Sequence, residues 1–318
     1  MIDFSFLIFG RNVSLDVLSV KEYSCVNFYG VSFMENMDFY NIPIFIISYN
    51  RKETLKLCIE RFQKDGYKNL IILDNASTDE STLAYLKDLS CKVVFFKKNY
   101  GHHVLWDCGL FDDIIKSEYY VLTDPDVLPI EECPSDYVEQ FYRILEQYPE
   151  KTKVGFALKL DDLPENYKYK YDIIRFESFY WEKRMQYQFP IYDAPIDTTF
   201  ALYRPGGVAV KNNFYNGIRS GYPYIARHLG WYVNNFSQED YYSNSVTQIS
   251  TSLSDEAMNG FRCSVIGQLA IKQGKNLYEV MRLIYSPKFI RMHANWKSII
   301  ITIVYLLAKK IAVTLRLK

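Results

Sequence analysis

Short apolar runs alternate with segments of helical periodicity between residues 42 and 160. The runs are apolar almost throughout rather than at every second position, which is typical of strands buried on both faces of a sheet. They span residues 43–48, 70–73, 93–96, 119–123 and 154–158. We therefore expect a set of parallel strands at the centre of the fold.

Between these runs, apolar residues recur three or four positions apart, as on one face of a helix. The first helix carries Leu55, Ile59 and Phe62 and is expected to end at Gly66. The other helices are expected around Leu83–Leu89, over residues 104–116, and from Pro134, which suits a first helical turn, to Tyr148. This alternation predicts an α/β fold, Rossmann-like, with a mostly parallel sheet and helices on both faces. Residues 160–235 are less regular.

Polar residues gather where four of the predicted strands end. In such sheets, ligands bind beyond the carboxyl ends of the strands. Turns and helix caps also favour Asn, Asp, Ser and Gly, but four successive clusters at one edge favour a binding site. The clusters are Tyr49-Asn50-Arg51, the run from Asp74 to Asp79, the run from Asn99 to His103, and Asp124-Pro125-Asp126.

The nature of the clusters narrows the ligand. The sequence has neither the Gly-x-Gly of a dinucleotide site nor the glycine-rich Lys-Ser/Thr loop of a P-loop. Asp124 and Asp126 place two carboxylates on alternate residues around a proline. Such hard oxygen ligands suit Mg²⁺ or Mn²⁺ bridged to substrate phosphates, and a metal-bound diphosphate is a good leaving group.

In combination, these pieces resemble the GT-A fold glycosyltransferases, in particular glycosyltransferase family 2. The resemblance covers roughly residues 42–130 and includes a DxD motif at Asp124–Asp126. It implies that Asp74 contacts the base or ribose of a nucleotide-sugar, with a UDP-sugar as the expected donor. It also implies that Asp124 reaches the ribose and, with Asp126, the metal and diphosphate. Asn75 stands where the family often has an acid. Around the nucleotide we further place Tyr49, Asn50, Arg51, Asn75, Asn99 and Gly101.

The second half of the chain carries the candidates for acceptor chemistry. Gln238-Glu239-Asp240 resembles the family's xED motif, which implies a general base at Asp240 or Glu239; a helix N-terminal pair explains the same residues. Asp197, before a strand over residues 198–204, is the alternative base. His228 is a candidate third metal ligand or a packed histidine. Trp231 and Tyr232 suit stacking on an acceptor sugar or burial in the core.

Charge is unevenly distributed along the chain. The 37 basic and 37 acidic residues give zero net charge, which argues against a nucleic-acid-coating protein. Residues 280–318 hold eight basic and no acidic residues, leaving 29 basic against 37 acidic before them, a net charge of −8. The apolar run 299–308 is too short to cross a bilayer. Its helical pattern predicts an interfacial amphipathic helix on anionic lipid, or a helix packed on the body.

These observations divide the chain into three parts. Residues 1–41 have no clear pattern, residues 42–279 form the GT-A domain with a nucleotide-sugar half (42–130) and an acceptor half (131–279), and residues 280–318 form the tail.

The six cysteines show neither zinc nor redox spacing, and no signal peptide is evident, which favours the cytosol. We expect an inverting, metal-dependent glycosyltransferase, peripheral on the inner membrane face and acting on glycan or lipid-linked acceptors in surface-polysaccharide biosynthesis. A sugar nucleotidyltransferase and a catalytically inactive scaffold are the alternatives.

Overall fold

The computed structural model describes residues 5–8, 11–14, 37–206 and 216–232. The chain divides into two units, residues 1–39 and 40–318. In the first unit, β1 (Ser5–Ile8) and β2 (Arg11–Ser14) form an antiparallel pair. The candidate base residues Glu239 and Asp240 and the whole 280–318 tail lie outside the described residues.

The predicted parallel sheet is present. Its strands follow the order β5-β4-β3-β6, and neighbouring strands run parallel. Three of them are buried along their whole length; β5 lies at the sheet edge, where both its end residues are exposed, so residues 93–96 are not the fully buried run that their composition indicates. The strands are β3 (Ile44–Ser48), β4 (Leu70–Asp74), β5 (Lys92–Phe95) and β6 (Tyr120–Thr123).

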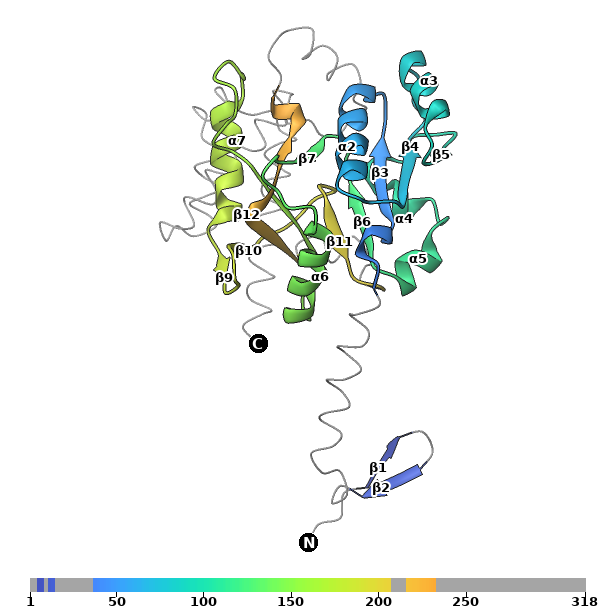
Figure 1. Ribbon diagram of the computed structural model, residues 1–318, viewed down its shortest axis with the longest axis vertical. Coiled ribbons are helices and arrows are strands. Elements are labelled where there is room, and N and C mark those ends of the chain that lie inside the picture. The colour runs from blue at the N-terminus through green and yellow to red at the C-terminus, as the bar shows by residue number, and fades with distance from the viewer. Residues whose placement is uncertain (1–4, 9–10, 15–36, 207–215, 233–318) are drawn as a thin grey trace, which may run out of the picture. The chain divides into compact units, whose positions relative to one another are not determined.

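The helices that link these strands cover both faces of the sheet (Figure 1). On one face, Phe45 and Ile47 pack with residues of α4 and α5. On the other face lie α2 and α6, where Phe62 and Phe141 meet the ring of Phe200. The elements are η2 (Phe39–Asn41), α2 (Lys52–Lys64), α3 (Glu80–Asp88), η3 (Gly101–His103), α4 (Val104–Asp107), α5 (Asp112–Ser117) and α6 (Tyr137–Gln147).

Two helix predictions need correction. The single helix expected over residues 104–116 is broken into α4 and α5, because Gly109 takes a left-handed φ of 69° between them. The helix expected to start at Pro134 starts at Tyr137, with Asp136 as its N-terminal flanking residue. The predicted stop at Gly66 is confirmed: α2 ends at Lys64, and Gly66 has a φ of 98°.

The second half of the sheet is mixed. Beyond β6, the order continues β11-β8-β12-β10-β9, and β11 runs antiparallel to both of its neighbours. The strand expected over residues 198–204 is the shorter β11. Gly155 of β8 passes so close to β11 that an added Cβ would lie 2.2 Å from the carbonyl oxygen of Phe200. The elements are β7 (Val127–Pro129), β8 (Lys153–Leu158), α7 (Lys170–Glu177), η4 (Ser178–Trp181), β9 (Arg184–Met185), β10 (Ile191–Asp193), β11 (Ala201–Tyr203), β12 (Gly217–His228) and η5 (Leu229–Trp231).

The long strand β12 pairs with three other strands, β8, β10 and β7, and its end reaches the predicted site. Its first part runs parallel to β8, and its last residues pair antiparallel with β7. In that pairing His228 is opposite Val127, the residue after Asp126. Residues far apart in the sequence therefore meet at one edge.

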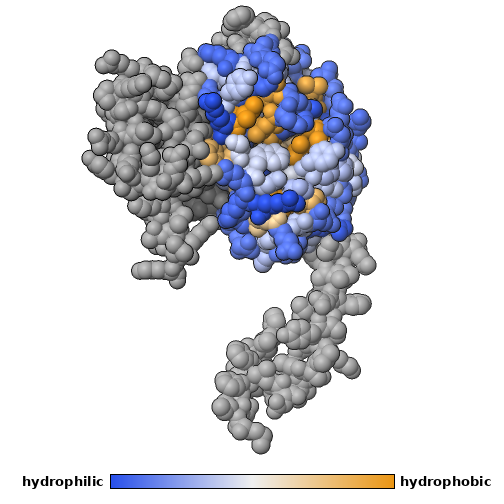
Figure 2. Space-filling view, turned by 90° about the vertical axis from the view of Figure 1, so that its left-hand side faces the viewer, coloured by the Kyte–Doolittle hydropathy of each residue, from blue (hydrophilic) through white to orange (hydrophobic). Residues whose placement is uncertain are grey.

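Figure 2 shows one face on which hydrophilic side chains predominate and apolar ones gather in patches between them. In the described part of the chain, no helix is long and apolar enough to cross a membrane.

Candidate functional site

The candidate site lies at the carboxyl ends of β3, β4 and β6, which are adjacent in the sheet (Figure 1). Asn50 follows β3, Asp74 is the last residue of β4, and Asp124 follows β6. The sequence predicted four polar clusters at one edge, and three of them follow these three strands. The fourth, residues 99–103, follows the neighbouring β5 and is joined to the loop after β4 through Asn75. The end of β12 adds His228 to the same edge.

Asp126 lies between β6 and β7 at this edge and is almost fully buried, with 1% of its side chain exposed. Its Oδ2 accepts a hydrogen bond from Nη1 of Arg51 at 2.7 Å. Its Oδ1 is buried and has no hydrogen-bond partner within the described structure, and His228 Nε2 lies 3.8 Å from it. A buried carboxylate oxygen without a donor is costly, so this oxygen is available to an incoming positive group.

The turn after β12 fixes His228 against Asp126. The backbone N–H of Leu229 donates to the carbonyl oxygen of Asp126 at 2.7 Å. An added Cβ on Gly230 would lie 3.2 Å from the His228 ring and 3.5 Å from Asp126 Oδ2, so the turn is closely fitted. Trp231 stacks on the His228 ring at 4.8 Å and is 4% exposed. Of the two alternatives for Trp231, the structure therefore supports burial rather than stacking on an acceptor.

Asp124 lies beside a second carboxylate. Its Oδ2 accepts a hydrogen bond from the Thr198 hydroxyl at 2.7 Å. Burial, and then the negative charges of Asp126 and Asp197, raise the pKa of Asp124 well above the usual aspartate value. Asp197 is exposed and directly precedes Thr198, so it lies beside Asp124. Of the three candidate bases, it is the one within the described residues. Nothing in the sequence pattern had singled out Thr198 as a site residue.

The loop after β4 is held by hydrogen bonds to the side chains of Asp74 and Asn50. Asp74 is 1% exposed, and its two carboxylate oxygens accept hydrogen bonds from the hydroxyl (2.5 Å) and the backbone N–H (3.2 Å) of Ser77. Asn50, held at a left-handed φ of 51°, accepts the backbone N–H groups of Thr78 and Asp79 through Oδ1. The predicted nucleotide contacts Asp74 and Asn50 thus shape this loop, and Tyr49 is half-buried beside them.

Asn75 joins this loop to the next one. Its Nδ2 donates to the carbonyl oxygen of Gly101 at 2.7 Å, and its Oδ1 accepts from the backbone N–H of Tyr100 at 2.9 Å. A carboxylate has no donor for the Gly101 carbonyl. This requirement accounts for an amide rather than an acid at position 75. The Oδ1 of Asn99 accepts from the N–H of Gly101, which completes the turn.

The side chains around Asp126 can bind a divalent metal ion only if substrate oxygens complete its coordination shell. No cluster of three or more His, Cys, Asp or Glu side chains with metal-binding geometry occurs among the described residues. Asp126 Oδ1 and His228 Nε2 supply two donor atoms that face each other. Mg²⁺ and Mn²⁺ accept few protein ligands when phosphate and water oxygens complete the shell. Asp124 is hydrogen-bonded to Thr198 instead.

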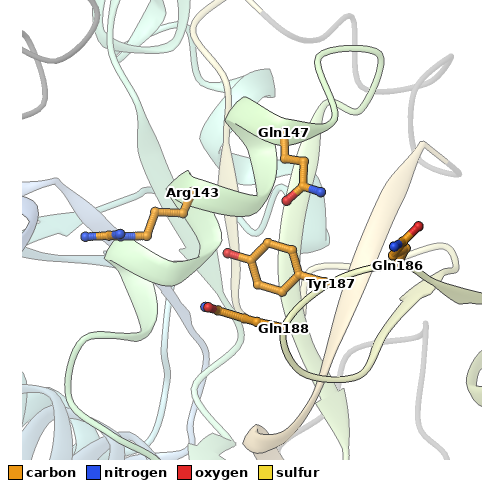
Figure 3. Close-up of a pocket in the computed structure, with 5 residues that line it drawn as sticks. All are labelled: Arg143, Gln147, Gln186, Tyr187 and Gln188. Carbon is orange, nitrogen blue, oxygen red and sulfur yellow. The ribbon is translucent and has the colours of Figure 1, made fainter.

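One pocket in the described structure lies elsewhere. It has a volume of about 530 Å³ and lies between α6 and the loop after β9. Figure 3 shows the ring of Tyr187 at its centre with amide side chains around it. It is lined by Arg143, Gln147, Gln186, Tyr187 and Gln188. None of the predicted site residues belongs to it.

The chain is similar to known proteins in sequence and in fold. The sequence model of the family described as Glycosyl transferase family 2 matches residues 44–207. No curated protein sequence matches the chain. Among solved structures, similarity extends to glucosyl-3-phosphoglycerate synthase from Mycobacterium tuberculosis, in complex with phosphoglyceric acid (15% identity, 74% of this chain and 81% of that chain, TM-score 0.36). The same enzyme in complex with Mn²⁺ and uridine-diphosphate-glucose gives 15% identity, coverages of 74% and 80%, and a TM-score of 0.34. These structural similarities are weak, and the family assignment rests on the sequence match.

Proposed function

The chain belongs to glycosyl transferase family 2, and on that premise we propose that it transfers a sugar from a nucleotide-sugar to a glycan or lipid-linked acceptor, with inversion and with Mg²⁺ or Mn²⁺. It is a glycosyltransferase with the GT-A type of mixed α/β fold. The observation that carries the metal-dependent part is the unpartnered Asp126 Oδ1 facing His228 Nε2 at the carboxyl ends of the strands.

The residues at this edge have distinct tasks in the proposed reaction. Asp126 and His228 would hold the metal, which neutralises charge on the departing diphosphate when bound. Arg51, 15% exposed and paired with Asp126, balances the charge of the carboxylate and places a second cation beside the diphosphate. Asn50 and Asn75 fix the two loops against which the nucleoside would lie.

Inversion requires a carboxylate opposite the leaving group to accept the proton of the acceptor hydroxyl. Such a base contributes about 10²–10⁴-fold in rate. Asp197 is exposed at the candidate site. Asp240 and Glu239, the candidates from the xED resemblance, lie outside the described residues. Substituting each of the three by its amide and measuring kcat identifies the base: one variant should lose about 10²-fold or more while the other two retain activity.

The test of the function uses a panel of nucleotide-sugars, UDP-sugars first, with Mn²⁺ and a crude glycan or lipid acceptor fraction. We expect metal-dependent release of one nucleoside diphosphate, reduced about 100-fold or more in Asp126→Asn. Asp161→Asn is the matched control, because Asp161 is 79% exposed and pairs with Lys159 on its own loop. Release of diphosphate by Asp126→Asn at the wild-type rate contradicts the metal role. Formation of a nucleotide-sugar from sugar phosphate would instead indicate a nucleotidyltransferase, and inactivity with every donor a scaffold.

Membrane attachment through residues 280–318, at the cytoplasmic face, is part of the same proposal. The support is the sequence alone: eight basic residues, no acidic residue, and an apolar stripe at helical spacing. The expected result is sedimentation of the full chain with vesicles containing anionic lipid, and its loss on truncation before Trp296. Sedimentation of the truncated chain with the same vesicles contradicts this proposal. Surface-polysaccharide biosynthesis is the setting that a lipid-linked acceptor would fit.

A further inference from the structure

Asp162 lies on the loop after β8 and contacts Arg227, near the end of β12, and Tyr232, which follows η5. Its Oδ2 accepts from Nε and Nη2 of Arg227 at 2.8 and 2.6 Å. Its Oδ1 accepts from the Tyr232 hydroxyl at 2.5 Å. Both carboxylate oxygens are therefore used, and all three donors come from one short segment of chain. We call Asp162, Arg227 and Tyr232 the Asp162 clamp.

The clamp encloses the turn that carries His228. Arg227 immediately precedes His228, and Tyr232 follows η5. Inside the clamp, the N–H of Tyr232 donates to the carbonyl of Leu229, and the N–H of Leu229 donates to the carbonyl of Asp126. The side chain of Asp162 thus closes a loop whose imidazole lies 3.8 Å from Asp126.

The backbone of the Asp162 loop is joined to the same segment. The N–H of Lys159 donates to the carbonyl of Ala226 at 2.8 Å, and the Tyr232 hydroxyl lies 3.4 Å from the carbonyl oxygen of Lys159. The loop that carries the Asp162 carboxylate is therefore held against β12 by a backbone hydrogen bond. Asp161 is 79% exposed, against 31% for Asp162, and its carboxylate lies 2.6 Å from Lys159 Nζ, whereas that of Asp162 lies 3.9 Å from the same ammonium group.

We propose that Asp162 is a positioning residue for the donor site, holding His228 toward Asp126 by clamping Arg227 and Tyr232 on either side of the turn. The inference rests on the proposed function. Replacing Asp162 by Asn leaves the Arg227 guanidinium without its carboxylate. The amide N–H group of the Asn then faces Arg227 or the Tyr232 hydroxyl, which both donate in the wild type. The turn then gains freedom, and His228 spends less time facing Asp126. Groups that orient a metal ligand contribute about 10- to 100-fold in metal affinity.

The test compares Asp162→Asn with the matched control Asp161→Asn, which removes the same charge one residue away. The probe is Mn²⁺ titrated by calorimetry in the presence of UDP, using the full chain. We expect Asp162→Asn to weaken Mn²⁺ binding about tenfold or more, Tyr232→Phe to weaken it by a smaller factor, and Asp161→Asn to leave it unchanged. Thermal melting of each variant checks that the fold persists.

A second readout needs no metal. The chain has four histidines, so the imidazole signal of His228 can be assigned in ¹⁵N-histidine-labelled protein by its loss in His228→Gln. The expected result is a sharp signal in the wild type and in Asp161→Asn, and a shifted or broadened one in Asp162→Asn. An unchanged His228 signal together with unchanged Mn²⁺ affinity in Asp162→Asn overturns the inference. Failure of the wild type to bind Mn²⁺ with UDP, ADP or GDP overturns the proposed function instead, and the His228 signal still decides the role of the clamp.

Discussion

Asn75→Asp changes a single group in a fully described hydrogen-bond network. The side chain is 2% exposed, and its amide donates to the Gly101 carbonyl while it accepts from Tyr100. An ionised carboxylate at this position keeps the second bond and places an oxygen where the donor was, 2.7 Å from a carbonyl oxygen. The substitution therefore costs one hydrogen bond and buries a charge against a like dipole.

The destabilisation of the Asn75→Asp variant is limited because the new carboxyl group can become protonated. The new carboxyl group restores the donor when it is protonated, and protonating an aspartate of ordinary pKa near 3.9 at pH 7 costs about 4 kcal/mol. Loss of a buried bond with an unsatisfied partner costs about 1–3 kcal/mol, and more when a charge is involved. We expect the free energy of unfolding to fall by about 2–4 kcal/mol at pH 7.

The pH dependence gives the sharper test. In the Asn75→Asp variant, the folded-state pKa of the introduced carboxyl group is raised above its unfolded value. The destabilisation is therefore absent below about pH 3.9 and grows as pH rises toward the folded pKa. The difference from wild type should shrink by up to about 1.4 kcal/mol per pH unit on going from the folded pKa of this carboxyl group down to about pH 4. The assay is urea unfolding of wild type and variant at each pH.

Asn99→Asp is the control, because the Oδ1 of Asn99 accepts from Gly101 in the turn and a carboxylate keeps that bond. It adds the same charge to the neighbouring loop and should change stability far less. A loss below about 0.5 kcal/mol for Asn75→Asp, or a loss that does not change with pH, refutes the account of why an amide occupies this position.

Three further predictions follow from single groups. Gly230→Ala should weaken Mn²⁺ binding in the presence of UDP about tenfold, because its Cβ would press on the His228 ring at 3.2 Å; calorimetry giving wild-type affinity contradicts the close fit. Burial, with a smaller contribution from Arg219, lowers the pKa of Lys153 to about 8, so the unfolded chain alone holds this proton between about pH 8 and pH 10.4. Wild-type stability should therefore gain up to about 1.4 kcal/mol per pH unit from Lys153 between about pH 8 and pH 9.5; an equal slope in Lys153→Met contradicts this. Glu177→Ala should cost about 3–5 kcal/mol in urea unfolding, because it leaves the buried Arg219 without its carboxylate at 2.6 Å; a cost below about 1 kcal/mol would show that water reaches Arg219.

The parallel half of the fold was predictable because three of its four strands, β3, β4 and β6, are buried along their whole length and are apolar almost throughout. β12 was not, because Arg219 and Ser220 are buried within it and satisfy their polar groups through partners that the pattern does not reveal. Arg219 pairs with Glu177, and the Ser220 hydroxyl donates to the carbonyl oxygen of Tyr224 at 2.6 Å and also contacts that of Gly155. A sequence pattern shows the polar residue and not its partner. β7 was missed for a simpler reason, since a three-residue strand has no periodicity.

The site was predictable to the same extent. The strand-end rule located Asp74, Asp124 and Asp126, and the family resemblance implied their tasks. It did not indicate that Asp74 is turned toward Ser77, or that Asn75 connects two loops, because both depend on the backbone conformation of loops with left-handed residues at Asn50 and Ala76. The sequence left His228 as either a third metal ligand or a packed histidine. Its place beside Asp126 depends on the pairing of β7 with β12, which the sequence pattern does not show. Asp162 gave no signal at all in the sequence.

The central claim is that Asp126 and His228 together hold a metal ion beside the donor diphosphate. Electron spin-echo spectroscopy of Mn²⁺, bound with the nucleoside diphosphate that the panel identifies, tests it in ¹⁵N-histidine-labelled protein. We expect a ¹⁵N coupling from one histidine that disappears in His228→Gln, and loss of bound Mn²⁺ in Asp126→Asn. Tightly bound Mn²⁺ without histidine coupling, or a coupling that survives in His228→Gln, would contradict it.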